Sequence, residues 1–290
     1  MIAVLGASGF IGQNIQSILR KYHQKEFQDI LMIYFKSSNN ILNNFNKISF
    51  DDFIKDKKLI DKVDTLIITC GNSNTHIDTD NFYEFLQKDT SYIFKMKDKI
   101  KCNVIFLSSA AVYDGNFGCA DEDENIYPNS LYGICKYSAE MAIRYIMKDI
   151  KYKKLIIYRL TYGYGKFERN NRLMSLIKDC IKNNNLLRVN GYNNYLNPLS
   201  AEFISNVMLK SAENIDIFPK KEVINLTSLE KIKLIDVLYT INSKYNFKYN
   251  LIKENTIVKY FPSNYKLKYY LKKLKLPEEN PKESILDYFS

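Results

Sequence analysis

The first two-thirds of the chain alternate short, continuous apolar runs with longer segments in which apolar residues recur at helical spacing. The apolar runs are rich in isoleucine, valine and leucine, and they occupy residues 2–5, 29–35, 63–69, 103–109 and 154–160. Runs of this kind are typical of strands that are buried on both faces of a parallel sheet. Because strand-like and helix-like segments alternate, the pattern predicts an α/β fold with a doubly wound parallel sheet.

The alternation loosens after about residue 166. Residues 172–184 and 233–245 have the periodicity of amphipathic helices, and residues 222–228 have the composition of a strand followed by a turn. We find no evident core for a separate fold in this part of the sequence. We therefore predict a main domain over residues 1–165 and a smaller C-terminal lobe over residues 166–290, partly integrated with the main domain.

Three glycines follow the first predicted strand directly and precede a predicted helix. Gly6 permits a tight strand-to-helix turn, Gly9 lets a pyrophosphate approach the backbone, and Gly12 lets the helix pack close to the strand. Phosphates would bind at the helix N-terminus, where free N–H groups and the helix dipole favour negative charge. The turn predicts a Rossmann-type dinucleotide site, whose residues are Gly6, Ser8, Gly9, Phe10, Ile11 and Gly12; a structural turn without a cofactor is the simpler alternative.

The end of the second predicted strand bears on the choice of cofactor. An acidic residue there would bind the ribose 2′-hydroxyl of NAD, but Tyr34 occupies that position and no carboxylate follows it. Lys36, Ser37 and Ser38 offer a charge and hydroxyl groups to a 2′-phosphate. We therefore predict NADP as the cofactor, bound in part by Lys36 and Ser37, with NAD as the alternative. Lys36 as an ordinary solvated lysine remains the competing interpretation.

Tyr132 and Lys136 are one helical turn apart, so both side chains project from the same helix face. An isolated phenol titrates near pH 10, and a neighbouring ammonium group stabilises the phenolate. A serine from a strand end would then bind the reacting oxygen beside the phenol. Ser109 is the candidate and Ser108 the second choice. The competing interpretation is a core tyrosine beside a solvated lysine.

Together these motifs resemble the extended branch of the short-chain dehydrogenase/reductase family, which contains nucleotide-sugar epimerases, dehydratases and reductases. The similar segments are "GASGFIG" (6–12), "SSAAVYDG" (108–115) and "YGICK" (132–136). Weaker similarity continues through "YRLTYGYG" (158–165) and "EVINLTS" (222–228). The resemblance implies that Ser109, Tyr132 and Lys136 are catalytic, that the last two also contact the cofactor, and that the C-terminal lobe binds a nucleotide sugar.

The sequence departs from the family pattern at two substrate positions. Tyr162 stands where family members often have an asparagine, and "YLN" (195–197) stands where they often have an Arg-Asp-Phe run. The substrate contacts must therefore differ in part. Our candidates are Ser109, Tyr132, Tyr162 and Arg172, and Arg169 and Arg188 are further arginines that would replace the missing contact.

A dehydratase is disfavoured because the residues after Ser109, "AAVY", include no carboxylate. Three other functions remain open at this point. The missing acidic residue at the second strand favours a reductase that uses NADPH to reduce a 4-keto sugar nucleotide. The alternative is a nucleotide-sugar 4-epimerase with tightly bound NAD. A dinucleotide sensor without catalysis is the third possibility, but the Tyr-x-x-x-Lys pair argues against it.

Composition narrows the possible partners. The chain has 290 residues, 46% of them hydrophobic, a net charge of +10, five cysteines and two histidines. The spacing of the cysteines fits no zinc site or redox pair, so we predict reduced thiols, no metal and a cytoplasmic protein. No zinc finger, RNA-binding signature or membrane span is recognisable, which argues against nucleic-acid and membrane partners. The family resemblance implies a homodimer formed through paired helices, with Met141, Ile143 and Tyr145 as candidate contacts.

Overall fold

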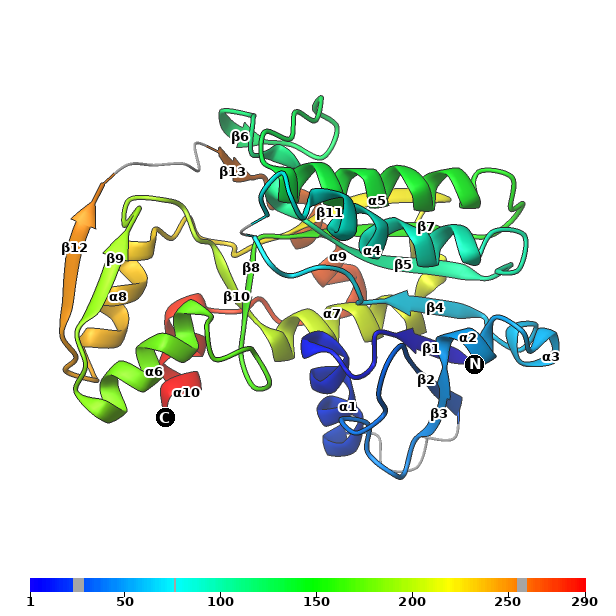
Figure 1. Cartoon of the computed structure of the whole chain (residues 1–290), viewed down its shortest axis with the longest axis horizontal. Helices are drawn as coiled ribbons and strands as arrows, with labels where there is room; N and C mark the ends of the chain where they lie inside the picture. Colours follow the sequence, from blue (N-terminus) through cyan, green and yellow to red (C-terminus); the bar gives the residue numbers. More distant parts are fainter. Residues whose placement is uncertain (23–28, 76, 255–259) are drawn as a thin grey trace.

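The computed structural model describes residues 1–22, 29–75, 77–254 and 260–290, and these form a seven-stranded parallel sheet at the centre of the molecule (Figure 1). The strands are β1 (Ile2–Leu5), β2 (Ile30–Tyr34), β3 (Asn46–Ser49), β4 (Thr65–Ile68), β5 (Asn103–Ser109), β7 (Leu155–Leu160) and β11 (Lys221–Leu226). Their order is β11-β7-β5-β4-β1-β2-β3. The chain winds away from β1 in both directions, so the topological switch lies between β1 and β4, where sheets of this kind bind ligands.

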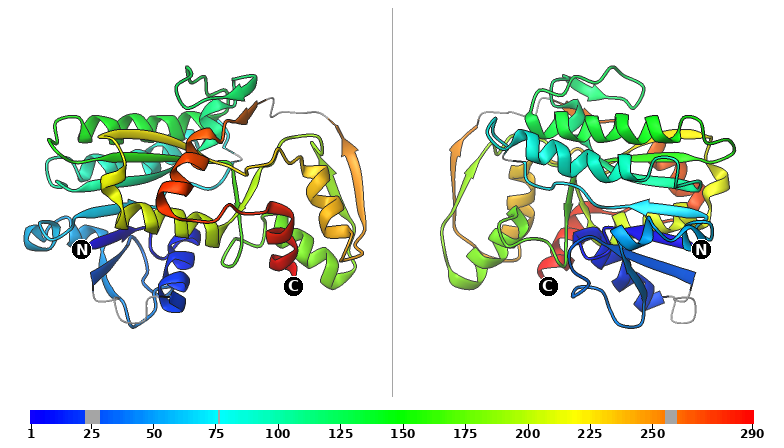
Figure 2. Two further views of the ribbon diagram at one scale, coloured as in Figure 1. Left: turned by 180° about the vertical axis from the view of Figure 1, so that it is seen from behind. Right: turned by 45° about the vertical axis from the view of Figure 1, so that its right-hand side comes forward.

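Helices cover both faces of the sheet. One face carries α1 (Phe10–Tyr22), α7 (Ala201–Glu213) and α9 (Tyr265–Leu274), and the other carries α4 (Phe82–Lys95) and α5 (Leu131–Met147) (Figures 1 and 2). Successive strand residues contribute to opposite cores: Val4 packs against α1 and α7, whereas Ala3 and Leu5 lie on the α4 and α5 side. The predicted doubly wound α/β fold is confirmed.

The predicted strands agree with the observed ones to within two residues at each end, but sequence reasoning missed the edge strand β3. Its four residues, "NKIS", are exposed or half-buried. An edge strand of this kind has no continuous apolar run, so the pattern that identified the central strands is absent there. The short helices α2 (Phe50–Phe53) and α3 (Lys57–Ile60) follow it and lead into β4.

The C-terminal part of the chain builds a lobe beside the sheet, on the left in Figure 1. It contains α6 (Leu173–Asn183), β9 (Leu187–Asn190), α8 (Leu234–Asn242), β12 (Tyr249–Lys253) and α10 (Pro281–Phe289). The expectation that this part lacks a core of its own is wrong. The lobe encloses a separate apolar cluster that includes Ile177, Val189, Val237, Leu238, Ile241 and Ile285.

Two short strand pairs lie outside the central sheet. β8 (Tyr162–Tyr164) pairs with β10 (Pro198–Ser200), and β6 (Gly118–Ala120) pairs with β13 (Tyr260–Pro262), both in parallel. After β7 the chain leaves the sheet, and it returns through α7 to form the edge strand β11. After the lobe strand β12 it forms β13 and then α9, which packs on the sheet. Among the residues described, no helix combines the length and the apolar character needed to cross a membrane.

Candidate active site

The glycine turn lies at the carboxyl end of β1, as the sequence predicts. Gly6 has a φ of 91°, and a Cβ atom there would lie 2.7 Å from the backbone nitrogen of Cys70. A Cβ atom on Gly12 would lie 2.4 Å from the carbonyl oxygen of Gly6. Both positions therefore require glycine, one for its conformation and close contact, the other for the packing of α1 on the turn.

Gly9 differs from the other two glycines because it is exposed. A Cβ atom there would meet only the carbonyl oxygen of Gly6, at 3.2 Å. The outer side of the turn is therefore open, beside the first N–H groups of α1, which lack acceptors within the helix. This shape fits a pyrophosphate. Ser8 and Phe10 are half-buried beside it, whereas the side chain of Ile11 points into the core and leaves only its backbone for a ligand.

The end of β2 lies at the same edge of the sheet as the glycine turn. The backbone N–H groups of Gly6 and Ala7 both donate to the carbonyl oxygen of Ile33, at 3.0 and 3.1 Å. Tyr34 is the last residue of β2 and is half-buried, and Lys36 and Ser37 follow it in exposed positions. Both predicted residues are thus accessible to a cofactor at this edge.

The two adjacent serines at the end of β5 have different environments. Ser108 is buried and donates from Oγ to Glu140 Oε1 at 2.6 Å. Ser109 caps the 3₁₀ helix η2 (Ala110–Tyr113), and its Oγ accepts from the backbone N–H of Ala111 at 3.1 Å. The hydroxyl proton of Ser109 is not used in that bond, so it is available for a ligand, which favours Ser109 over Ser108 as the site serine.

Close packing brings the start of α5 onto η2. A Cβ atom on Gly133 would lie 2.4 Å from the carbonyl oxygen of Ala111, so only glycine permits this approach. Ser130 caps α5 by accepting from the Gly133 N–H at 2.9 Å, and Asp114 in turn accepts from the Ser130 N–H at 3.0 Å. Because η2 begins directly after Ser109, this contact carries Tyr132 toward the end of β5. Sequence reasoning did not identify Gly133 as a site residue.

Lys136 lies one turn after Tyr132 in a buried environment. Its Nζ is 5.4 Å from the centroid of the Tyr132 ring and 3.1 Å from Asp89 Oδ2, on α4. Burial lowers the pKa of Lys136, but the negative charge that Tyr132 can carry and the Asp89 carboxylate outweigh that effect, so the net pKa is raised. The expectation of a lysine close to the tyrosine is confirmed by this geometry.

Asp89 was missed by sequence reasoning, although a signal for it exists. Asp89, Tyr92 and Ile93 lie on one face of α4, and all three are buried. A carboxylate on the apolar face of a helix requires a partner, because an unpaired buried charge is costly. The sequence shows a carboxylate on an apolar helix face, but it does not show that its partner is Lys136, 47 positions further along the chain.

Tyr162 and Arg172, two of the predicted substrate contacts, lie against each other. The Arg172 guanidinium is 4.8 Å from the Tyr162 ring centroid, and its Nη2 donates to the Gly163 carbonyl at 3.3 Å. Burial raises the pKa of Tyr162 to about 12, so its phenol is neutral at ordinary pH. Arg169 and Arg188 are both exposed.

The later family-like motifs form a buried hydrogen-bond network beneath the site. Arg159 Nη2 donates to Glu140 Oε2 at 2.8 Å, and its Nη1 donates to the Tyr113 hydroxyl at 2.5 Å. The Tyr113 hydroxyl donates to Asn225 Oδ1 at 2.9 Å. The network joins η2, α5, β7 and β11, so these residues fix the elements that carry the site.

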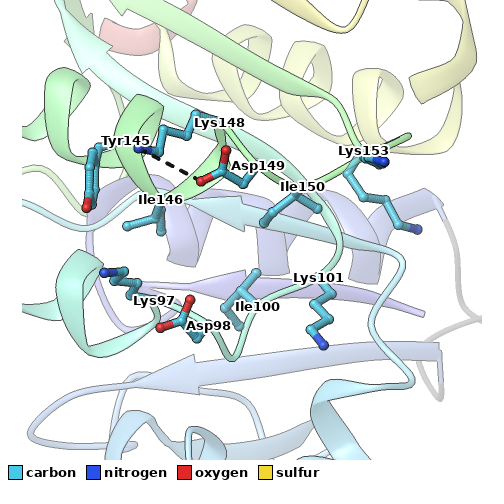
Figure 3. A pocket seen from close by; sticks show the side chains of 11 residues that line it. Lys97, Asp98, Ile100, Lys101, Tyr145, Ile146, Lys148, Asp149, Ile150 and Lys153 are labelled. Atoms are coloured by element: carbon cyan, nitrogen blue, oxygen red, sulfur yellow. Dashed lines mark ion pairs between the residues drawn. The ribbon is translucent and has the colours of Figure 1, made fainter.

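A cavity of about 690 Å³ lies at the opposite edge of the sheet (Figure 3). It is lined by the connections that lead from α4 to β5 and from α5 to β7, with the cationic residues Lys97, Lys101, Lys148, Lys151 and Lys153. These connections precede the amino ends of β5 and β7, whereas Ser109 ends β5. The cavity is therefore separate from the candidate site.

The described residues contain no group of three His, Cys, Asp or Glu side chains that could hold a metal ion. Both histidines, His23 and His76, lie outside the described residues. The five cysteines are free thiols.

Comparison with known proteins gives consistent results. The curated ADP-L-glycero-D-manno-heptose-6-epimerase of Brachyspira hyodysenteriae (strain ATCC 49526 / WA1) is 27% identical over 195 residues, which span 61% of this chain and 59% of that relative. UDP-glucuronic acid 4-epimerase from Bacillus cereus, solved in complex with NAD, superposes with a TM-score of 0.77 at 19% identity, covering 99% of this chain and 98% of that one.

UDP-glucose 4-epimerase from Thermotoga maritima, solved with UDP-glucose, superposes with a TM-score of 0.78 at 16% identity and covers 99% of this chain and 97% of that one. At these identities the structural likeness establishes the fold alone. The model of the NAD dependent epimerase/dehydratase family, however, matches residues 2–226, well over half of the chain. The chain therefore belongs to the NAD-dependent epimerase/dehydratase family.

Proposed function

We propose that this chain is a nicotinamide-dinucleotide-dependent enzyme that acts on nucleotide sugars, with Tyr132 as the group that moves a proton. The observation that carries the proposal is the close packing of α5 on η2 through Gly133, next to Ser109. This packing supports a site in which a serine hydroxyl and a phenol contact the same substrate oxygen. The open glycine turn at the adjacent strand supports binding of the dinucleotide there.

Each of the three side chains has a distinct role in this proposal. A bound nicotinamide supplies the hydride exchange at a sugar carbon. Tyr132 gives a proton to the oxygen on that carbon, or takes it away, according to the direction of reaction. Ser109 donates a hydrogen bond to that oxygen while its Oγ still accepts from the Ala111 N–H. Lys136, held as an ammonium, stabilises the phenolate form of Tyr132.

Epimerisation of the sugar is the reaction that the relatives favour. The curated relative and both solved structures reported above are named as epimerases. In an epimerase the same Tyr132 removes a proton in the oxidation and returns it in the reduction, so Ser109, Tyr132 and Lys136 suffice without a further acid. This agrees with the absence of a carboxylate from the residues that follow Ser109, "AAVY".

Reduction of a 4-keto sugar nucleotide with NADPH is the second candidate. It is supported by one observation, the exposed Lys36 and Ser37 at the end of β2 in place of an acidic residue. No comparison supports a preference for NADP. We therefore propose that the dinucleotide binds at this edge. One measurement distinguishes NAD from NADP.

That measurement is the release of nucleotide on denaturation. We expect purified protein to release close to one equivalent of NAD, as an epimerase that regenerates its cofactor would. Protein that releases no dinucleotide, but oxidises NADPH in the presence of a 4-keto sugar nucleotide, would instead establish the reductase. A Tyr132→Phe variant that retains full turnover in either assay would overturn the catalytic proposal.

We also propose that the lobe over residues 166–290 binds the nucleotide sugar, with Arg172 of the lobe and Tyr162 of the preceding strand β8 as contacts. Their support is their mutual contact at the junction between β8 and α6. The test is the affinity for a UDP-sugar in an Arg172→Ala variant, measured by calorimetry. We expect weaker binding with an unchanged dinucleotide content, and equal affinity would contradict the assignment.

A homodimer through the outer faces of α4 and α5 is the last part of the proposal. Phe94, Met141 and Tyr145 are 49%, 50% and 46% exposed on these helices, and the rings of Phe94 and Tyr145 are 6.5 Å apart. Exposed apolar residues that gather on one face are typical of an interface. Ile143, which the sequence had offered as a third contact, is fully buried in the core and is excluded.

A further inference from the structure

Asp89 and Lys136 form a buried ion pair beside the proposed proton-transfer residue. Their side chains are 1% and 9% exposed, and Asp89 Oδ2 is 3.1 Å from Lys136 Nζ. The other carboxylate oxygen, Oδ1, accepts from the backbone N–H of Asn72 at 2.5 Å. The carboxylate is therefore anchored to the segment after β4 by one oxygen and faces the lysine with the other.

Gly71 bounds this ion pair on one side. A Cβ atom on Gly71 would lie 2.8 Å from Lys136 Nζ and 3.2 Å from Asp89 Oδ1, so a larger residue there would displace the ammonium or the carboxylate. Because the pair is closed in on this side, the lysine has little freedom to leave the carboxylate. In this arrangement Nζ lies 5.4 Å from the centroid of the Tyr132 ring.

Four titratable groups interact with Lys136: Asp89 on α4, Tyr132 and Cys135 on its own helix, and Cys70 after β4. Burial raises the pKa of the Cys135 thiol to about 11, so this thiol is neutral at ordinary pH. Burial raises the pKa of the Cys70 thiol to about 12, so this group is neutral at ordinary pH. Tyr260 of β13 faces Tyr132, and burial raises its pKa far above the ordinary range. Among the described groups around the lysine, Asp89 is therefore the one that forms an ion pair with it.

We propose that Asp89 is a positioning residue that holds Lys136 as an ammonium and offsets part of its charge, thereby setting the pH at which Tyr132 exchanges its proton. The inference rests on the proposed roles of Tyr132 and Lys136. A lysine alone would stabilise the phenolate with its full charge. With a carboxylate at 3.1 Å, the field that reaches the phenol is weaker, because the two charges of the pair partly cancel.

The sign of the expected change follows from this arrangement. Asp89→Asn removes the anion but keeps an oxygen that can accept from the Asn72 N–H. The uncompensated ammonium then stabilises the phenolate more strongly, so the acid limb of kcat/KM moves to lower pH by about one unit. At the same time Lys136 loses its carboxylate partner, so its pKa falls.

The first experiment does not depend on catalysis. The side-chain nitrogen of Lys136 is titrated by nitrogen-15 NMR in the wild type and in Asp89→Asn, and the signal is assigned with Lys136→Arg. In the wild type we expect a midpoint above the ordinary value of 10.5, and in the variant a midpoint at least one unit lower. Equal midpoints in the two proteins would overturn the proposal.

A matched control tests whether any nearby carboxylate has this effect. Asp149 is exposed and lies 3.9 Å from Lys148 at the far end of α5. Asp149→Asn should leave both the Lys136 midpoint and the pH profile unchanged. If Asp89→Asn fails to fold, the wild-type titration alone tests the proposal. A Lys136 midpoint above the ordinary value of 10.5 supports a stabilising carboxylate, and a midpoint below it contradicts one.

The second experiment is the pH profile of the reaction, with Asp89→Glu as a test of rescue. We expect Asp89→Asn to move the acid limb to lower pH and Asp89→Glu to return it toward the wild type. A limb that stays in place while kcat falls would indicate a merely structural role and overturn the proposal. If the wild type has no activity on nucleotide sugars, the proposed function fails. The Lys136 titration still tests whether Asp89 holds Lys136 as an ammonium.

Discussion

The two serines at the end of β5 are adjacent in the chain but are held by different partners. Ser108 donates to Glu140, which also binds Arg159, so its hydroxyl belongs to the buried network under the site. Ser109 accepts from the Ala111 N–H and keeps its own proton available. At the scale of single residues, the two serines thus differ in whether the hydroxyl proton is already donated to a side chain of the protein.

This difference predicts opposite effects for two matched substitutions. Ser109→Ala should lower kcat by about 10²- to 10³-fold, because a hydrogen bond to the reacting oxygen is lost, at a stability cost of about 1 kcal/mol for the lost cap. Ser108→Ala should cost about 1.5–3 kcal/mol, because the Glu140 carboxylate loses a buried donor, while kcat changes little. Urea unfolding and steady-state kinetics on both variants check this, and equal kinetic losses would contradict it.

At the scale of elements, the position of Tyr132 depends on how the first turn of α5 is held against η2. Asp114 accepts from the backbone before α5, Ser130 caps the helix, and Gly133 permits its close approach to Ala111. These contacts are local in space, but they join segments up to 22 positions apart. The glycine is the position at which this docking can be tested most directly.

We expect Gly133→Ala to displace the start of α5, because the new methyl carbon would lie 2.4 Å from the Ala111 carbonyl oxygen. The better helix propensity of alanine would favour the substitution elsewhere, but overpacking at this contact should cost about 1–3 kcal/mol. Turnover should fall more than dinucleotide binding, since the glycine turn is untouched. Lys148→Ala, at the exposed end of the same helix, serves as control, and a Gly133→Ala enzyme with normal turnover would refute the docking argument.

A second element-scale contact joins the loop after β6 to the edge strand β11. Glu122 is buried and accepts from the Asn225 N–H at 2.8 Å. Burial raises the pKa of Glu122 to about 7 from 4.5, against the effect of that hydrogen bond. A carboxyl whose pKa is raised in the fold contributes stability that is present below pH 4.5 and lost as the pH rises through 7.

The free energy of unfolding should therefore fall between about pH 4.5 and pH 7 by up to about 3 kcal/mol from this residue. Glu122→Gln removes the titration while keeping an acceptor for Asn225, so the variant should have a flatter pH dependence over this range. Urea unfolding at several pH values measures it. Glu124→Gln, at an exposed position of the same loop, should retain the wild-type slope, and a flat wild-type profile would contradict the assignment.

At the scale of the whole molecule, the fold could be predicted from sequence where burial is two-sided. The central strands are continuous apolar runs because each one faces two helix layers, and the glycine turn is recognisable because its three residues are close in sequence. The core of the lobe could not be found in this way, because Ile177, Val237 and Ile285 come from helices far apart in the chain. Each helix alone resembles an ordinary amphipathic surface helix.

In the candidate site, too, contacts within one element could be predicted from the sequence, whereas contacts between elements could not. Tyr132 and Lys136 share one helix, so their spacing alone predicts that they lie together. Asp89 contacts the lysine from a different helix, and no periodicity relates the two positions. Sequence patterns report contacts within an element well, whereas contacts between elements require the packing of α4 on α5.

That same pair of helices provides the test of assembly. The outer faces of α4 and α5 expose Phe94, Met141 and Tyr145, and a twofold axis would place this patch against its own copy. Light scattering on wild-type protein should give twice the chain mass of 34.1 kDa. Met141→Glu should give the mass of one chain, because a charge would be buried in an apolar interface without a partner.

Tyr239→Glu is the matched control, since Tyr239 is 59% exposed on α8 in the lobe, away from both helices. It should remain dimeric. Dinucleotide content should be unchanged in both variants, because α1, which follows the glycine turn, packs on the opposite face of the sheet from α4 and α5. Turnover is compared only after the mass is known, since α5 carries Tyr132. A wild-type protein with the mass of one chain at every concentration would contradict the dimer, and a dimeric Met141→Glu would move the interface to another face.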